Sequence, residues 1–177
     1  MAKWTIDPAH SEIGFKVKHL MISTVSGKFT RFQAEAETKS DDDFLGASIH
    51  FSAEVDSIQT GMEARDSHLK SEEFFHASAF PQIGFQSTGL EKSGDDSYDL
   101  TGNLTIRDVT KSITLQAVFQ GLMKDFSGNT KAGFEVTGTI NRHDFGLKWN
   151  AITEAGGIVV SDHVKLHMDI QMQRSSE

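Results

Sequence analysis

The sequence lacks several features that would point to particular classes of protein. Cysteine is absent from its 177 residues, which excludes disulfides and thiolate chemistry and leaves the redox compartment open. Basic residues are few, since 17 Lys and Arg against 25 Asp and Glu give a net charge of -8. That balance argues against a surface that neutralises nucleic-acid phosphates. No apolar run approaches the roughly 20 residues that a membrane-spanning helix needs.

These absences favour one domain over residues 1–177, with no transmembrane segment and no nucleic-acid partner. The first residues, MAKWTIDPAHS, enter domain-like sequence at once and lack the apolar stretch of a signal peptide. As it stands, the sequence therefore predicts a cytoplasmic protein, and a leader removed from a precursor would make it periplasmic.

What the chain does have is a period-two alternation of apolar and polar residues, which is typical of β-strands with one wet face. Eight antiparallel strands can close into an up-and-down barrel, and closure removes exposed strand edges. The sequence thus predicts an all-β fold, an extended eight-stranded antiparallel barrel, with a two-sheet sandwich as the alternative. The expected strands cover residues 10–19, 25–38, 47–55, 83–85, 100–106, 113–119, 134–140 and 164–172.

A short helical insert is expected between strands three and four. Thr60 and Glu63 have the spacing of a capping box, which predicts a helix over about 61–70. Ser71 with two following acids predicts a second helix start, and Pro81 prevents its continuation. Between them lie three large apolar side chains, Phe74, Phe75 and Phe80. The segment is too short to bury these rings against itself, so we expect it to cap one end of the barrel.

At this strand number the interior is either filled by side chains or holds one small ligand. Small inward residues, including Ala47, Ala53, Ala117 and Gly138, leave room for a cavity. Phenylalanine (13 Phe, 1 Tyr, 2 Trp) supplies bulk without hydroxyls that need partners. Strand phase assigns the inward residues, and a one-residue slip would exchange the two faces. The predicted lining of an apolar tunnel is Ile13, Phe15, Val17, Phe29, Ile49, Phe51, Phe74, Phe75, Phe85, Leu104, Leu115, Phe134, Val136, Leu166, Met168 and Ile170.

The histidines do not predict a metal site. His163 and His167 are four residues apart, but on a strand that spacing separates them by about 13 Å. No HExxH motif, cysteine pair or dense carboxylate loop is present.

Catalytic motifs are equally scarce. Ser11 after His10 is typical of a turn and a strand start. Asp66 lies near His68 in the sequence, but Arg65 and Asp66 are expected as charges on the exposed side of a short helix. The sequence has no GxSxG elbow and no glycine-rich phosphate loop. The prediction is a protein that is not an enzyme and has no cofactor.

Four polar residues interrupt otherwise apolar patterns: His19, Arg142, Asp144 and Lys148. One interpretation is that they are satisfied groups, or salt bridges that close strand ends. The other is a polar rim that hydrogen-bonds the head group of a ligand. Both can hold together.

Seven motifs, in order along essentially the whole chain, match one protein family. They are WTIDPAHS at 4–11, FKVKH at 15–19, STVSGKF at 23–29, RDSHLKSEEFF at 65–75, FPQIGFQST at 80–88, GNLTIRDVTK at 102–111 and NRHDFGL at 141–147. On these residues the sequence resembles the bacterial YceI-like, polyisoprenoid-binding proteins. Two departures are His76, where the family often has an acid, and Asp108, where glycine is common. Asp tolerates turn conformations, so the second change is expected to be harmless.

The resemblance implies a lipocalin-like barrel whose apolar tunnel holds a long isoprenoid chain or an isoprenoid quinone. The implied activity is binding or carriage, linked to isoprenoid-quinone metabolism or stress tolerance, with homodimer formation left open. Many relatives carry a secretory signal, so its absence argues against a periplasmic role. Two alternatives remain, namely a filled barrel that acts as a protein-interaction module and a hydrolase or isomerase of a tunnel-bound lipid.

Overall fold

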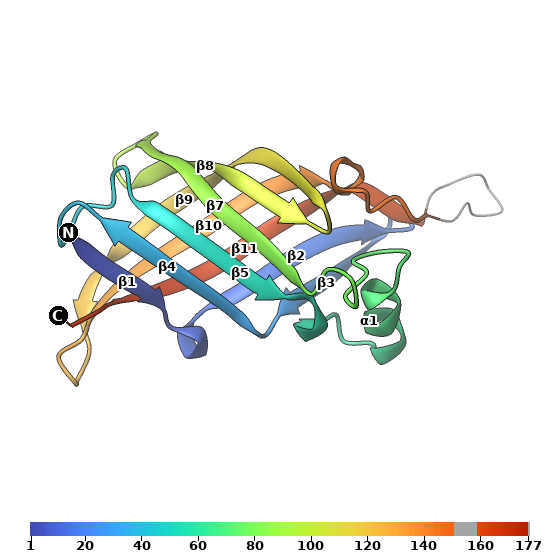
Figure 1. Ribbon diagram of the computed structural model, residues 1–177, viewed down its shortest axis with the longest axis horizontal. Helices are drawn as coiled ribbons and strands as arrows, with labels where there is room; N and C mark the ends of the chain where they lie inside the picture. The colour runs from blue at the N-terminus through green and yellow to red at the C-terminus, as the bar shows by residue number, and fades with distance from the viewer. Residues whose placement is uncertain (151–158, 177) are drawn as a thin grey trace.

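A single antiparallel sheet of eleven strands closes on itself in the computed structural model, which describes residues 1–150 and 159–176 (Figure 1). Closure comes from the first and last strands, with Trp4 opposite Arg174. The strands are β1 (Ala2–Ile6), β2 (Glu12–His19), β3 (Ser23–Phe29), β4 (Phe32–Thr38), β5 (Ser48–Glu54), β6 (Ile58–Gln59), β7 (Gln82–Lys92), β8 (Ser97–Ile106), β9 (Val109–Lys124), β10 (Thr130–Asn141) and β11 (Val160–Arg174).

The eleven strands occupy eight strand positions around the barrel, here called lines, because three of these lines each consist of two shorter strands placed end to end. β1 and β2 lie end to end along β11, where Ile6 is opposite Met172 and Glu12 is opposite Asp169. In the same way β3 continues into β4, and β5 continues into β6. The prediction of an eight-stranded up-and-down barrel is therefore confirmed, although the first line begins at Ala2 and the predicted strand over 25–38 is two strands.

The helical insert and the helix predicted over about 61–70 are confirmed, but the predicted capping box and the second helix start are wrong. Helix α1 (Glu63–Lys70) has Met62 as its N-cap, with no side-chain cap. The hydroxyl of Thr60 donates to Asp66 Oδ1 at 2.5 Å and accepts from Arg65 Nε at 2.7 Å, so it is not available for a capping box. Ser71 is the C-cap of α1, and its hydroxyl donates to the carbonyl of His68.

Residues 71–80 form hydrogen-bonded turns instead of a second helix. The N–H groups of Phe74 and His76 both donate to the carbonyl of Ser71, and His76 adopts the left-handed conformation with φ 51°. In the β8–β9 turn the left-handed residue is Arg107 (φ 56°), so Asp108 does not need the conformation that glycine favours. No helix among the described residues is long and apolar enough to span a membrane.

An aromatic cluster fills the end of the barrel at which both termini lie, opposite α1 (Figure 1). The ring of Phe44 lies 4.9 Å from that of Trp4 and 4.9 Å from that of Phe134, and Phe119 lies 5.3 Å from Phe134. Trp4 also donates its indole N–H to Thr38 Oγ1 at 3.2 Å. This cluster closes one end of the interior.

Candidate functional site: an apolar cavity in the barrel

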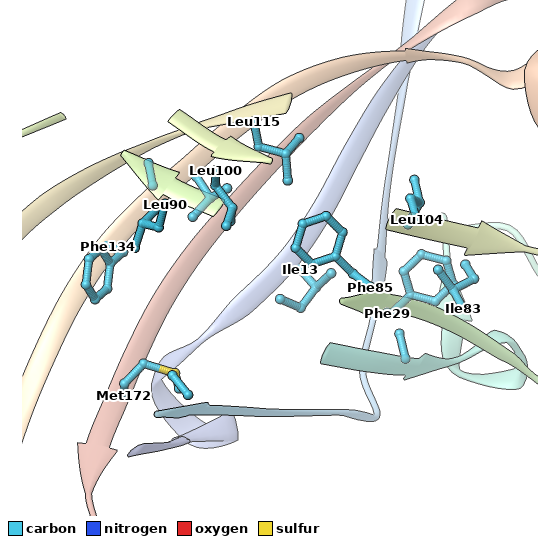
Figure 2. Packing of buried hydrophobic residues seen from close by; sticks show 14 of the residues in the cluster. Ile13, Phe29, Ile83, Phe85, Leu90, Leu100, Leu104, Leu115, Phe134 and Met172 are labelled. Atoms are coloured by element: carbon cyan, nitrogen blue, oxygen red, sulfur yellow. The ribbon is translucent and has the colours of Figure 1, made fainter. Parts of the chain in front are cut away.

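A cavity of about 270 Å³ lies inside the barrel, with Leu69 and Phe75 in its wall at the α1 end and Phe44 and Met172 at the other. All sixteen residues predicted to line an apolar tunnel lie in the cavity wall. Figure 2 shows several of them, together with other core residues, projecting from different strands into the interior. Their contact with a ligand remains a prediction, but strand phase assigned the inward face correctly.

Three inward-facing glycines hold large side chains against the wall. A Cβ atom built on Gly27 would lie 2.3 Å from Phe15 Cζ, and one on Gly138 would lie 2.3 Å from Leu115 Cδ2. A Cβ on Gly102 would meet the ring of Phe85 at 2.4 Å. Each large side chain therefore occupies the space above a glycine and leaves more of the barrel axis open. Gly138 was expected to make room, whereas Gly27 and Gly102 were missed although they share the inward phase.

The cavity wall is apolar apart from one residue. Among the described residues that line it, Arg142 alone has an ionisable side chain, and that residue is only 3% exposed. Its Nε donates to the carbonyl of Ser161 at 2.9 Å, and its Nη1 donates to those of Leu147 at 2.6 Å and Trp149 at 2.8 Å. Burial lowers the pKa of Arg142, and the nearby Asp162 carboxylate opposes that change.

Backbone carbonyls therefore accept hydrogen bonds from most of the N–H groups of the Arg142 guanidinium. Its bonds tie the 3-10 turn η3 (Arg142–Phe145) to residues 147–149 and to the start of β11. This is the role of a satisfied group at a strand end, one of the two interpretations made from the sequence.

The other three proposed rim residues do not share the cavity wall with Arg142. His19 is half-buried at the end of β2, while Asp144 and Lys148 are exposed. The sequence pattern made these residues visible, but Asp144 and Lys148 lie outside the strands, where strand phase does not set the direction of a side chain, and His19 is the last residue of β2. A head-group contact from any of them stays a prediction.

The insert covers the cavity through two of its three phenylalanines. Phe74 and Phe75 line the cavity, and the Phe75 ring lies 6.2 Å from that of Phe29. Phe80 instead packs on the ring of His76 at 5.7 Å, with the guanidinium of Arg107 5.9 Å from its centroid. The expected cap is therefore confirmed for two rings and not for the third.

The possible triad fragments have separate partners. Arg65 and Asp66 both bond to Thr60 and are half-buried, so their expected place on the exposed side of the helix is wrong. His68 pairs with Glu73 and packs edge-to-face against Trp149, whose ring centroid is 4.8 Å away. Ser11 bonds to the backbone of Gln171. No pair among these has the geometry of a nucleophile and its base.

One group of potential metal ligands lies on the outer face of β10 and β11. The ligand atoms of Glu135, His167 and Asp169 lie within 4.8 Å of one another, and all three side chains are partly or fully exposed. His163, the other member of the histidine pair, is not part of this group.

The fold and the site define a closed antiparallel β-barrel with an apolar interior. A family model described as the YceI-like domain matches residues 4–172, so the chain belongs to the YceI-like family. UPF0312 protein SAS2572 of Staphylococcus aureus (strain MSSA476) is 35% identical over 176 residues, which is 99% of each chain.

Solved structures agree with this assignment. The Campylobacter jejuni YCEI protein is 32% identical, with a TM-score of 0.75 over 97% of this chain and 96% of that one. A polyisoprenoid binding domain from Saccharophagus degradans shares the fold, with a TM-score of 0.74 over 97% of this chain and 98% of that one, at 15% identity.

Proposed function

We propose that the chain binds a long isoprenoid lipid in the barrel cavity and carries it without chemical change. The observation that carries this proposal is the cavity wall, which is apolar in every described residue except Arg142, whose donors are directed largely at backbone carbonyls. The description of the Saccharophagus degradans structure as a polyisoprenoid binding domain supports the same ligand class.

Burial of the lipid tail supplies most of the binding free energy. Each CH₂ group buried contributes about 0.8 kcal/mol, while a head-group hydrogen bond contributes about 1 kcal/mol net. A tail of several isoprene units therefore outweighs any head group. The barrel selects by the length and girth of the tail, and an isoprenoid quinone, the ligand that would link the protein to quinone metabolism or stress tolerance, meets that requirement.

The two ends of the cavity suggest an orientation for the ligand. The packed rings of Trp4, Phe44 and Phe134 close the end near the termini. Arg142, the polar residue of the wall, lies with Val160 and Leu147 near the start of β11, which pairs with the end of β2. The tail therefore points toward the aromatic cluster, and the head group lies at the α1 end.

The described wall offers no group suited to transform such a lipid. General acid–base or nucleophilic catalysis needs a titratable group within hydrogen-bond reach of the reacting atom. Arginine side chains stay protonated in proteins. The guanidinium of Arg142 is also bound to backbone carbonyls. This wall supports binding without turnover, and added prenyl esters are expected to remain intact.

The test compares the same substitution on the two faces of β11. Leu166→Arg places a charge in the cavity, whereas His167→Arg places it outside, one residue further along the strand. Purified proteins are extracted with organic solvent, and the extracts are analysed by mass spectrometry. We expect an isoprenoid from the wild type and from His167→Arg, and none from Leu166→Arg.

Circular dichroism shows whether each variant keeps its β-sheet, and Phe15→Arg provides a second inward charge on β2. Equal lipid content in the wild type and in both inward variants, with the fold retained, would contradict the proposal. A wild-type protein that contains no lipid and takes up none would favour the filled barrel.

A further inference from the structure

The turn between β2 and β3 presents three large apolar side chains to solvent. Leu20, Met21 and Ile22 are 40%, 61% and 84% exposed. Leu20 and Met21 have φ values of 52° and 59°, in the left-handed region where hairpin turns favour glycine, asparagine or aspartate. The turn therefore carries bulky apolar residues at positions that small polar ones would occupy with less strain. Strain of this kind is typical of functional segments.

The β2–β3 hairpin that carries this turn is basic, although the protein as a whole is acidic. Residues 13–29 contain Lys16, Lys18 and Lys28 and no Asp or Glu, although the chain has a net charge of -8. All three lysines are exposed on the outer face of the hairpin. Their neighbours in the sequence, Phe15 and Val17, face the cavity. Lys165 of β11 lies directly opposite Lys16 and is also exposed.

Two of the hairpin lysines, Lys16 and Lys18, lie on the half of β2 that leads into the turn, whereas Lys28 lies further from it, opposite Gly14. Lys16 and Lys165 are like charges in opposite positions, an arrangement that destabilises a sheet when nothing compensates it. The acids of the same strands, Glu12 and Asp169, face each other further from the turn. Asp162, at the start of β11, bonds to His143 at 2.7 Å. An external anionic surface would compensate the lysines.

We propose that the β2–β3 hairpin docks the protein on an anionic lipid bilayer. Leu20, Met21 and Ile22 enter the boundary between head groups and acyl chains, and the lysines nearest the turn, Lys18 and Lys16, lie at the level of the lipid phosphates. An apolar edge with lysines beside it is the arrangement by which peripheral proteins hold to membranes. Exposed apolar patches of this kind mark interaction sites in proteins.

A second copy of the chain fits this surface less well. A two-fold contact would place the same patch on both subunits and bring the lysines of one hairpin toward those of the other. A bilayer with anionic head groups satisfies the apolar turn and the lysines together. The hairpin lies at the end of the barrel away from the termini, as α1 does (Figure 1). The bound molecule would therefore present its α1 end to the lipid.

The test is sedimentation with large vesicles of phosphatidylcholine alone or with about one third phosphatidylglycerol. The wild type is expected to partition onto the anionic vesicles and to be released by added salt, because salt screens the lysines. Removing each lysine lowers the partition coefficient about fivefold. Lys16→Ser with Lys18→Ser is therefore expected to lower it about 25-fold.

The apolar contribution is tested with Met21→Asn and Ile22→Ser, since asparagine tolerates the left-handed conformation. The matched control is Met123→Ser with Phe126→Ser, which removes exposed apolar side chains from the end of β9 and the β9–β10 turn, near the termini. The first pair is expected to lose vesicle binding and the second to keep it.

Absence of wild-type binding to anionic vesicles would overturn the proposal, as would unchanged binding by both hairpin variants. A hairpin variant that converts a dimer into a monomer, without any vesicle binding by the wild type, would assign the surface to a second copy. Because the readout is partition onto vesicles, these outcomes do not depend on whether the cavity holds an isoprenoid.

Discussion

At the scale of single residues, the open interior depends on glycines as much as on the apolar side chains that line it. Leu115 and Phe15 lie over Gly138 and Gly27, so each occupies a place that a Cβ atom would take. Without those glycines, the same large side chains would turn toward the barrel axis. The width of the cavity is therefore set at positions that never touch a ligand through a side chain.

Gly138→Ala tests this dependence. The added Cβ would lie 2.3 Å from Leu115 Cδ2, the far end of a flexible side chain, so Leu115 is expected to rotate into the cavity. Overpacking of this size costs about 1–3 kcal/mol. We expect a folded protein that yields less extracted lipid per mole, measured by mass spectrometry, together with a lower urea midpoint.

Gly84→Ala is the control for Gly138→Ala, because a Cβ there meets nothing within 4 Å. It is expected to keep the wild-type lipid content. Full lipid content in Gly138→Ala would show that Leu115 does not limit the cavity.

At the scale of the elements, the sequence predicts features that depend on the local alternation of apolar and polar residues. It misses features that depend on contacts with residues far away in the sequence. Strand phase placed every predicted lining residue of the strands in the cavity wall, and the apolar insert added Phe74 and Phe75. The five-residue strand β1 was missed, although Ala2 and Trp4 alternate with Lys3 and Thr5, because the segment is too short to stand out.

The break between β3 and β4 had no local signal either. The N–H of Thr30 donates to the carbonyl of Ser57, which is 27 residues away in the sequence. The role of Arg142 likewise depends on carbonyls contributed by residues 147–149 and by β11. Residue type made Arg142 visible, but only the fold shows what its guanidinium binds.

Asp7, which lies between β1 and β2, predicts that the stability of the fold depends on pH. Asp7 accepts from Lys131 Nζ at 2.9 Å and from His10 Nδ1 at 2.9 Å, and its side chain is 16% exposed. The hydrogen bond from Lys131 lowers the pKa of Asp7 below its ordinary value of 3.8, with a smaller contribution from His10. The stability gained from charged Asp7 is therefore complete above the unfolded pKa and is lost as pH falls through the folded pKa.

Asp7→Asn is expected to lower the free energy of unfolding at pH 7 by about 1.5–3 kcal/mol, the range for hydrogen bonds to charged groups. The difference from the wild type should shrink as pH falls below 3.8. Urea titrations at both pH values measure it, and Lys131→Met in a double-mutant cycle isolates the pair. A coupling energy that is the same at neutral and acid pH would assign the effect to packing.

At the scale of the whole molecule, the barrel is sealed by pairing of its two terminal strands and by the aromatic cluster at the same end. The opposite end is covered by α1 and the turns that follow it, through Phe74 and Phe75. A ligand in such a barrel contacts most of its strands at once, because the wall includes residues from β2 to β11. Its binding energy should therefore stabilise the fold as one unit and not a single element.

Removal of the ligand is expected to lower the melting temperature. A ligand that binds only the folded state at 100 times its Kd adds about 2.7 kcal/mol to the free energy of unfolding. For a domain of 150–250 residues, each kcal/mol shifts Tm by about 2–4 °C, so the shift is about 5–11 °C. Calorimetry of protein stripped with organic solvent, refolded and titrated with isoprenoids of increasing length measures it. If long-chain additions leave Tm unchanged, the interior is filled by its own side chains; if Tm rises with tail length until the tail outgrows the barrel, the interior is a binding tunnel closed at one end.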